Sequence, residues 1–282
     1  TCALPILQGG LGEGDFGLIF GNPGGGKSWT LIALGAHAVS LGYNVIHYTL
    51  ELSEGYVGKR YDAFFTRISV DKLKLNKEKV VDATSDLPGQ LIVKEYPMGK
   101  ASMSTIESHI KKCIDLDFKP DLIIIDYVDL LSSKRRNGER KEEIDDIYTS
   151  TKGLARELKL PVWSVSQVNR AGAKDSIIEG DKAAGSYDKI MIADFAMSLS
   201  RQKKDKVNGT GRFHIMKNRY GMDGMTFNAK VDTSTGHIDI LNEMTEEEED
   251  AQNVKPKQTK TEIGLDNLDK EYLAKQFFAL NK

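Results

Sequence analysis

The chain has 282 residues, of which 40% are hydrophobic and 28% charged, and its 39 Lys and Arg against 41 Asp and Glu give a formal net charge of -2. This length predicts one large domain with appendages, and the composition excludes a collagen-like, a disulfide-scaffold and a wholly disordered chain. The nearly balanced charge argues against a protein that binds nucleic acid merely by being basic, and having only Cys2 and Cys113 favours a reducing compartment.

Short apolar runs alternate along the chain with stretches of helical periodicity, which is typical of a mostly parallel sheet with helices on its faces. Strands are predicted at residues 16–21, 44–50, 90–96, 121–126, 161–166 and 195–200. Helices are predicted between them, at residues 27–41, 53–69, 104–117 and 139–158. Ser104 and Glu107 have the spacing of a capping box at the start of the third helix. We therefore expect an α/β fold.

Three further short runs, at residues 212–217, 225–231 and 237–241, are separated by turns that contain Gly and Asp. They predict antiparallel hairpin strands that extend the parallel sheet. We therefore expect a single α/β domain over residues 1–242.

Residues 243–282 differ from the rest in composition. They hold ten acids and six bases, so this segment carries a net charge of -4 and leaves +2 for residues 1–242. Residues 243–261 predict a flexible linker of acidic and basic residues. Residues 262–282 predict an amphipathic tail helix, which either packs back on the body or frays, or binds a partner.

One glycine-rich segment matches the pattern G-x-x-x-x-G-K-[ST], follows an apolar strand and opens a helix, which is the context of a phosphate-binding loop. Its glycines let backbone N–H groups close around a phosphate at the helix N-terminus. Lys27 is placed to bridge the β- and γ-phosphates, and Ser28 to bind Mg²⁺. The alternative is a purely structural turn. The predicted nucleotide-binding residues are Gly21, Asn22, Pro23, Gly24, Gly25, Gly26, Lys27, Ser28 and Trp29.

Three polar residues follow apolar strands and are expected at the carboxyl edge of the sheet, where ligands bind in open α/β folds. Asp126 is suited to hold Mg²⁺ and its water shell, although a strand-terminal Asp is also a common helix cap. Glu51 is placed to orient and deprotonate an attacking water, the alternative being a capping acid before the helix at Ser53. Gln167 is a neutral donor and acceptor suited to sensing a γ-phosphate.

Lys217 and Arg219 lie two residues apart near the end of a predicted edge strand, so their side chains point to the same side. An arginine that reaches the γ-phosphate of a neighbouring subunit neutralises charge in the transition state and couples hydrolysis to subunit motion. The alternative is a solvated pair that discourages edge-to-edge strand pairing. The predicted catalytic residues are Glu51, Lys27, Gln167, Arg219 and Lys217.

Five segments together resemble, in order and spacing, the motor domain of the DnaB-type hexameric replicative helicases, which are RecA-like P-loop ATPases. They are GNPGGGKS, HYTLELSE, LIIIDYVDLL, ARELKLPVWSVSQVNR and KNRYG. The tract GLARELKLPV followed by SVSQVNR is the most specific, since other P-loop ATPases have no reason to carry it. The resemblance covers roughly residues 9–231 and looks closest to the phage branch, such as the helicases of T-even-like phages.

The resemblance implies ATP and Mg²⁺ as cofactors, a homohexameric ring with ATP bound between subunits, and Lys217 and Arg219 acting in trans. It also implies 5′→3′ movement on single-stranded DNA, which the loops at residues 132–141 and 171–186 hold in the central channel. Neither loop has an aromatic side chain, so contacts to DNA phosphates are expected; the alternative is a mobile charged surface. The implied DNA-binding residues are Lys134, Arg135, Arg136, Arg140, Lys141, Lys174, Lys182 and Gly185.

Three features depart from the family's pattern. Asp129 replaces the family's usual Gln, so the role of that Gln does not transfer. The second loop lacks the family's Arg-Glu-Ser-Gly run. Because the chain begins at Thr1, about where the motor's first strand should already have started, we expect a trimmed fragment without the amino-terminal primase-interacting domain and linker helix, which should weaken ring formation.

The partners and location follow from the same resemblance and from the hydropathy. The family implies primase and a helicase loader or other replisome proteins. No apolar run approaches the roughly 20 residues that span a bilayer and no signal peptide opens the chain, so we expect no membrane partner and a cytoplasmic protein of a bacterial cell or phage-infected host.

The sequence thus predicts an ATP-driven replicative helicase motor. Two alternatives remain at this point. One is a RecA-like recombinase or regulatory assembly ATPase that binds DNA or protein without unwinding; no polymerisation segment for a recombinase is visible. The other is a P-loop small-molecule kinase, for which the expected lid arginines are lacking.

Overall fold

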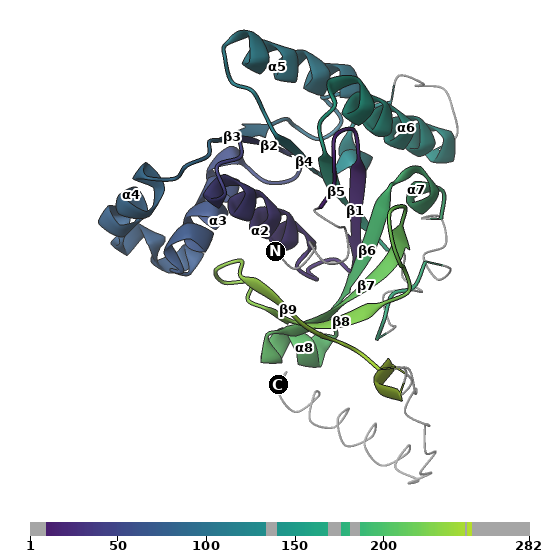
Figure 1. Cartoon of the computed structure of the whole chain (residues 1–282). Helices are drawn as coiled ribbons and strands as arrows, with labels where there is room; N and C mark the ends of the chain where they lie inside the picture. The colour runs from purple at the N-terminus through teal and green to yellow at the C-terminus, as the bar shows by residue number, and fades with distance from the viewer. Residues whose placement is uncertain (1–9, 134–139, 169–175, 181–186, 246, 250–282) are drawn as a thin grey trace, which may run out of the picture.

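Nine strands form one sheet in this computed structural model, which describes residues 10–133, 140–168, 176–180, 187–245 and 247–249 (Figure 1). Within these residues the strand order is β3-β2-β4-β5-β1-β6-β7-β8-β9. Six strands pair in parallel: β1 (Phe16–Gly21), β2 (Val45–Thr49), β3 (Leu91–Glu95), β4 (Leu122–Asp126), β5 (Val162–Gln167) and β6 (Phe195–Ser200). Three antiparallel strands continue the sheet beyond β6: β7 (Thr210–Asn218), β8 (Thr226–Val231) and β9 (Ile238–Glu243).

The central parallel strands form because their sequences are almost continuously apolar and both of their faces are covered. Every residue of β1, β2 and β6 is buried. The register aligns Gly21 at the end of β1 with Gln167 at the end of β5, and Thr49 at the end of β2 with Asp126 at the end of β4. The segments that follow these four strands therefore leave the sheet along one edge.

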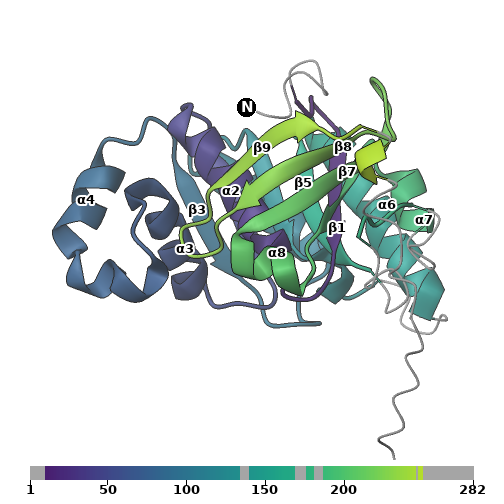
Figure 2. The ribbon, with the colours of Figure 1, turned by 90° about the horizontal axis from the view of Figure 1, so that it is seen from below.

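Helices cover both faces of the sheet (Figures 1 and 2). On one face lies α2 (Lys27–Ser40), whose Leu31 and Val39 share a core with residues of β1 and β4, and α3 (Glu54–Thr66) packs against α2. On the other face lie α5 (Met103–Asp115) and α6 (Arg140–Leu158). The shorter elements are η1 (Val70–Leu75), α4 (Lys77–Ser85), η2 (Val128–Leu130), α7 (Tyr187–Ile192) and α8 (Lys203–Asn208).

The predicted α/β class, the nine predicted strands and the four predicted helices are confirmed, and the strand ends move by at most two residues. The five short helical elements were not predicted. α4 shows why, because it has no buried residue and so lacks the apolar periodicity by which a helix is recognised.

The predicted capping box at the start of α5 is wrong by two residues. Ser102, in an extended conformation, is the N-cap, and its Oγ accepts a hydrogen bond from the Thr105 amide. The Thr105 hydroxyl in turn accepts from the Ser102 amide at 3.2 Å, in the place where Glu is usual. Glu107 pairs with Lys111 one turn further along the helix instead.

The sheet extends slightly into the predicted linker. β9 includes Glu243, and the Met244 amide donates to the Thr226 carbonyl at 2.8 Å. The predicted tail helix at residues 262–282 lies outside the described residues, and the division into domain, linker and tail stays a prediction.

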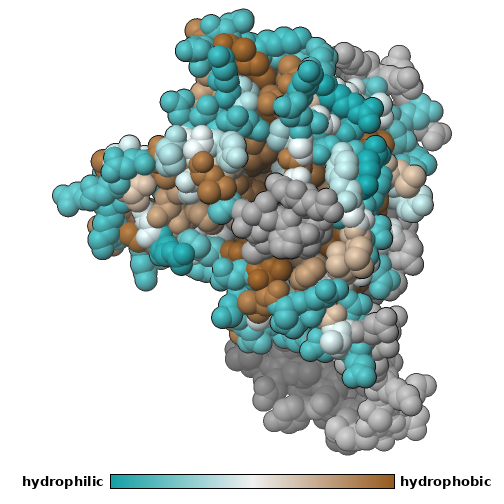
Figure 3. All heavy atoms as spheres, in the orientation of Figure 1, coloured by the Kyte–Doolittle hydropathy of each residue, from teal (hydrophilic) through white to brown (hydrophobic). Residues whose placement is uncertain are grey.

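None of the helices that the structure describes is long and apolar enough to cross a bilayer. The face shown in Figure 3 is hydrophilic around its rim, with hydrophobic residues gathered towards its middle.

Candidate active site

The loop between β1 and α2 has the backbone conformation that the glycine pattern predicts. Gly24 and Gly26 have positive φ angles of 63° and 106°, which side chains with a Cβ rarely adopt. Gly26 is the N-cap of α2 and gives no side-chain cap, and the first turn of the helix holds no acid. Backbone N–H groups at this helix start therefore remain available to an anion.

Lys27 lies buried beneath this loop. Its Nζ donates to the carbonyl oxygens of Gly21 and Asn22, both at 2.9 Å, so the ammonium group is held where the loop turns. Burial lowers the pKa of Lys27 to about 8, although the negative charges of Asp126 and Glu51 act to raise this pKa. A phosphate beside the ammonium would favour its charged form and raise this pKa again.

Asp126 ends β4 and is 2% exposed. Burial raises the pKa of Asp126, and the Ser28 hydroxyl partly offsets this rise. The Oδ1 atom of Asp126 has no hydrogen-bond partner within the described part of the chain. A buried carboxylate oxygen without a donor, beside a serine hydroxyl, fits Mg²⁺, which binds oxygen ligands and uses few protein groups when phosphates supply the others. The residues present thus fit the metal.

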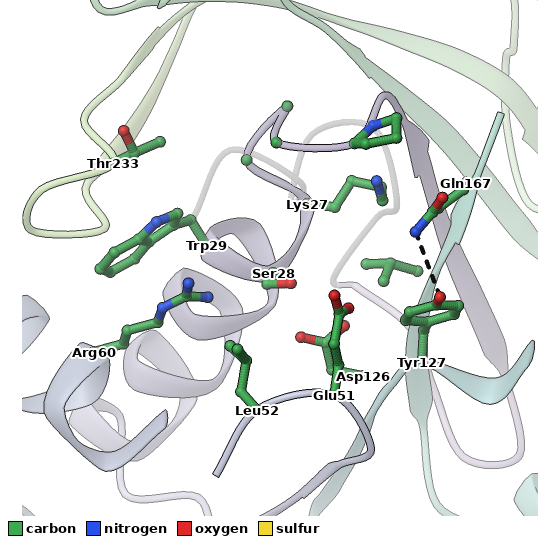
Figure 4. A pocket seen from close by; sticks show the side chains of 15 residues that line it. Lys27, Ser28, Trp29, Glu51, Leu52, Arg60, Asp126, Tyr127, Gln167 and Thr233 are labelled. Atoms are coloured by element: carbon green, nitrogen blue, oxygen red, sulfur yellow. Dashed lines mark hydrogen bonds between the residues drawn. The ribbon is translucent and has the colours of Figure 1, made fainter. Parts of the chain in front are cut away.

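A cavity of about 360 Å³ opens where these residues meet (Figure 4). Glu51 enters it from the segment after β2, and Gln167 enters it from the end of β5, where its Nε2 donates to the Tyr127 hydroxyl at 3.4 Å. The lining residues are Pro23, Gly24, Gly25, Gly26, Lys27, Ser28, Trp29, Glu51, Leu52, Arg60, Asp126, Tyr127, Val165, Gln167 and Thr233. Sequence reasoning placed most of the chemically active side chains of this set at one edge.

Arg60, on α3, is a functional candidate that the sequence analysis missed. Its guanidinium lies 4.7 Å from the ring centroid of Trp29 and 5.1 Å from that of Tyr56, so two aromatic faces hold it at the cavity. Its Nε is buried without a hydrogen-bond partner in the described residues, and its charge favours the ionised form of Asp126. A Tyr56–Arg60 pair at helical i, i+4 spacing after Glu51 is the signal that could have indicated it.

Lys217 and Arg219 do not line this cavity. The Lys217 Nζ donates to the Ile190 and Met191 carbonyls at 3.0 and 2.7 Å, and burial lowers the pKa of Lys217. Arg219 follows β7, with its Nε 3.3 Å from Asp194 Oδ1, and is 44% exposed. Because a role in trans concerns the site of another subunit, it stays a prediction.

Two of the predicted DNA-binding residues are described, and both have acidic neighbours. Lys141 Nζ lies 2.9 Å from Asp188 Oδ2, and Arg140 Nη1 lies 3.7 Å from Glu143 Oε2. Both basic side chains are more than 70% exposed. The other predicted DNA contacts lie outside the described residues: Lys134, Arg135, Arg136, Lys174, Lys182 and Gly185. The DNA-binding set therefore stays a prediction.

A second cavity, of about 300 Å³, lies between α2 and strands β5 to β9. Its walls are mainly aliphatic and aromatic, including Trp163, Phe195, Phe213 and Phe227. It therefore lacks the density of polar groups that phosphates need, and the first cavity is the candidate nucleotide site.

Residues 3–233 match the model of the family described as DnaB-like helicase C terminal domain. The chain belongs to this family. The match includes every residue that lines the first cavity, together with Lys217 and Arg219. The resemblance found in the sequence motifs is thereby confirmed.

Relatives of this DnaB-like domain include phage and bacterial proteins. A DnaB-like replicative helicase of Enterobacteria phage T4 is 26% identical over 232 residues, which cover 77% of this chain and 48% of that protein. The replicative DNA helicase DnaB of Rhodothermus marinus is 28% identical over 184 residues, 60% of this chain and 19% of that protein. The chain spans about half, or less, of the length of these relatives.

Solved structures share the fold of this domain. One of them, described as an ATPase domain, superposes with a TM-score of 0.71 at 22% identity and covers 86% of this chain and 89% of that chain. A second structure, described as a DnaB-like replicative helicase and its interactions with primase, has a TM-score of 0.70 at 21% identity, with 82% and 58% covered. The expected RecA-like fold of this DnaB-like domain is thereby confirmed.

Proposed function

We propose that this chain is the ATP-hydrolysing motor of a replicative DNA helicase, which translocates 5′→3′ on single-stranded DNA as a hexameric ring and unwinds duplex DNA ahead of it. The observation that carries the proposal is the convergence of Lys27, Ser28, Asp126, Glu51 and Gln167 on one cavity in a DnaB-like domain. We also propose that it acts in the cytoplasm of a bacterial cell or phage-infected host.

Each residue of the cavity has a chemical role in this proposal. The N–H groups at the start of α2 and the Lys27 ammonium bind the β- and γ-phosphates. Ser28 and Asp126 would hold Mg²⁺, which neutralises phosphate charge when bound. Glu51 orients a water and takes its proton as the water oxygen bonds to the γ-phosphorus and the bond to the β-phosphate oxygen breaks. Gln167 hydrogen-bonds the γ-phosphate or the water.

The ring completes the site in this proposal. Lys217 and Arg219 from one subunit reach the phosphates bound by the next and neutralise charge in the transition state. Their absence from the lining of the cavity in their own subunit, and the exposure of Arg219, support an action in trans.

DNA and other replication proteins are the proposed partners. The basic residues 134–141 and the loop at 171–186 would bind phosphates of single-stranded DNA in the channel. Primase and a helicase loader are proposed as protein partners, and the first draws support from a structural neighbour described with its primase interactions. The relatives named above are replicative helicases, so nothing favours the recombinase alternative.

A fork-unwinding assay tests the proposal. The protein with ATP and Mg²⁺ is given forked duplexes that carry only a 5′ or only a 3′ tail, and strand separation is followed by the release of a labelled strand. We expect unwinding of the fork with the 5′ tail and none with a Lys27→Ala variant, which cannot hold the phosphates. DNA-stimulated ATP hydrolysis without strand separation would instead favour an assembly ATPase.

A further inference from the structure

Asp129 and Lys189 form an ion pair that lies mostly inside the molecule and outside the lining of the first cavity. Asp129 lies in η2, three residues after Asp126, and Lys189 lies in α7. Their side chains, which are 14% and 11% exposed, are joined between Asp129 Oδ1 and Lys189 Nζ. These two residues are 60 positions apart in the sequence, so folding alone brings them together.

The surrounding hydrogen bonds fix the geometry of the pair. The Tyr148 hydroxyl donates to Asp129 Oδ2 at 2.8 Å, and Lys189 Nζ donates to Ser166 Oγ at 2.9 Å. Lys189 Nζ also lies 5.0 Å from the ring centroid of Tyr148. A buried ion pair of this kind is costly to break from one side, because the remaining charge is left without a partner. α7 therefore cannot shift against η2 without breaking this cluster.

The cluster connects three regions that the proposed function uses. Ser166 directly precedes Gln167, which lines the nucleotide cavity. Tyr148 belongs to α6, the helix that follows the first proposed DNA loop, and α7 follows the second. The carbonyls of Ile190 and Met191, at the end of α7, accept hydrogen bonds from Lys217.

We propose that the Asp129–Lys189 pair is a positioning pair that holds α7 against η2, α6 and the end of β5, and thereby couples DNA binding to ATP hydrolysis. This rests on the proposed helicase function. The hydrogen bonds and the ion pair join η2, α6, α7 and β5 by direct contacts, and a network of this kind couples two sites when both sites bias its arrangement. An amide at position 129 would leave the Lys189 charge unpaired, so the proposed role depends on the carboxylate of Asp129.

A double-mutant cycle tests this role on the full chain. The variants are Asp129→Asn, Lys189→Met and the double variant that carries both. Each is measured for melting temperature, for ATP hydrolysis without DNA, and for the ratio by which saturating single-stranded DNA stimulates hydrolysis. Glu157→Gln is the matched control, because it removes an ion pair with Lys111 in which both side chains are more than half exposed, on α6, the helix that also carries Tyr148.

The double variant separates positioning from mere structure. The single variants are expected to melt at lower temperature because each leaves a buried charge unpaired, and the double variant is expected to recover much of that loss. Its stimulation ratio should nevertheless fall about fivefold or more, a typical magnitude for lost coupling between sites, while Glu157→Gln keeps the wild-type ratio. A double variant with recovered melting temperature and a ratio within about twofold of wild type would overturn the proposal. So would an equal loss in Glu157→Gln.

Two further outcomes keep the test decisive. If the double variant fails to fold, hydrogen exchange of residues 187–192 is followed in the wild type. Single-stranded DNA alone and a non-hydrolysable ATP analogue alone should each slow it, and no change with either ligand overturns the proposal. If the wild type shows neither DNA stimulation nor unwinding, both the helicase function and this inference are wrong. If the wild type shows normal coupling and the double variant is unaffected, only the inference is wrong.

Discussion

Lys27 and Asp126 show, at the scale of single residues, how burial prepares a site for a charged ligand. Burial lowers the pKa of Lys27 to about 8 and raises the pKa of Asp126, so in both cases it disfavours the charged form. A phosphate beside Lys27 and a divalent cation beside Asp126 each reverse that penalty. The site therefore gains electrostatic stabilisation when nucleotide and metal bind together.

The lowered pKa of Lys27 predicts the pH dependence of nucleotide binding. The protonated ammonium is the form that binds phosphate, and the free protein loses this proton as pH rises through about 8. Affinity for a non-hydrolysable ATP analogue with Mg²⁺ should therefore be highest below that pH and fall by up to about tenfold per pH unit above it. Titration calorimetry between about pH 7 and 9 measures this, and Lys27→Met should bind weakly with a flat profile. An equally steep profile in Lys27→Met would assign the effect to another group.

Glu51 provides the second test at this scale. Replacing its carboxylate by an amide keeps the size and one acceptor oxygen but removes the base, so Glu51→Gln should bind ATP normally and hydrolyse it about 100-fold more slowly or worse. Single-turnover hydrolysis and binding of a fluorescent ATP analogue check the two halves. Hydrolysis near the wild-type rate would remove Glu51 as the general base.

At the scale of elements, the site exists because four parallel strands end together. β1, β2, β4 and β5 deliver the phosphate loop, Glu51, Asp126 and Gln167 to one edge, and the strand register fixes which residues are neighbours there. α3 then places Arg60 beside Trp29 at the same cavity. The chemistry depends on short segments, whereas the alignment depends on the buried strands beneath them.

The cap of α5 gives a test at the element scale. Ser102→Ala removes the hydroxyl that accepts from the Thr105 amide, so the free energy of unfolding should fall by about 1 kcal/mol. Ser104→Ala removes a hydroxyl that is hydrogen-bonded to Ser102 Oγ at 2.8 Å but caps no backbone amide, and it should change this free energy by less than about 0.5 kcal/mol. Urea denaturation of both variants measures the difference. Equal losses would show that Ser102 is not the cap that stabilises the helix.

At the scale of the whole molecule, the proposed ring requires sites shared between subunits. Arg219→Ala removes the group supplied in trans, and Lys27→Ala removes the group supplied in cis, so each variant alone should hydrolyse ATP poorly. Mixed rings contain some interfaces with an intact Lys27 and an intact Arg219, and they should recover part of the activity. Hydrolysis measured across mixing ratios checks this, and no recovery at any ratio would count against shared sites.

Much of the fold and of the site could be predicted from local sequence patterns, because their signals are local. The glycine pattern specifies a loop conformation over eight residues, and apolar strands followed by Asp126 or Gln167 specify the sheet edge. The capping box failed because two serines near the start of the helix both suit an N-cap, and only the backbone conformation separates Ser102 from Ser104. The net charge of -2 hides an uneven distribution, because residues 243–282 carry a net charge of -4 and residues 1–242 carry +2.

The sequence by itself thus determined the class of fold, the phosphate loop and the family, since each rests on spacing within a short segment. Only the tertiary structure decided the strand order, the place of Arg60 at the cavity and the pairing of Asp129 with Lys189. The physical reason is that these depend on contacts between segments far apart in the chain, which are set by packing of the whole core. The sequence around Lys189 does not indicate Asp129 as its partner, because only the packing of the core brings the two side chains together.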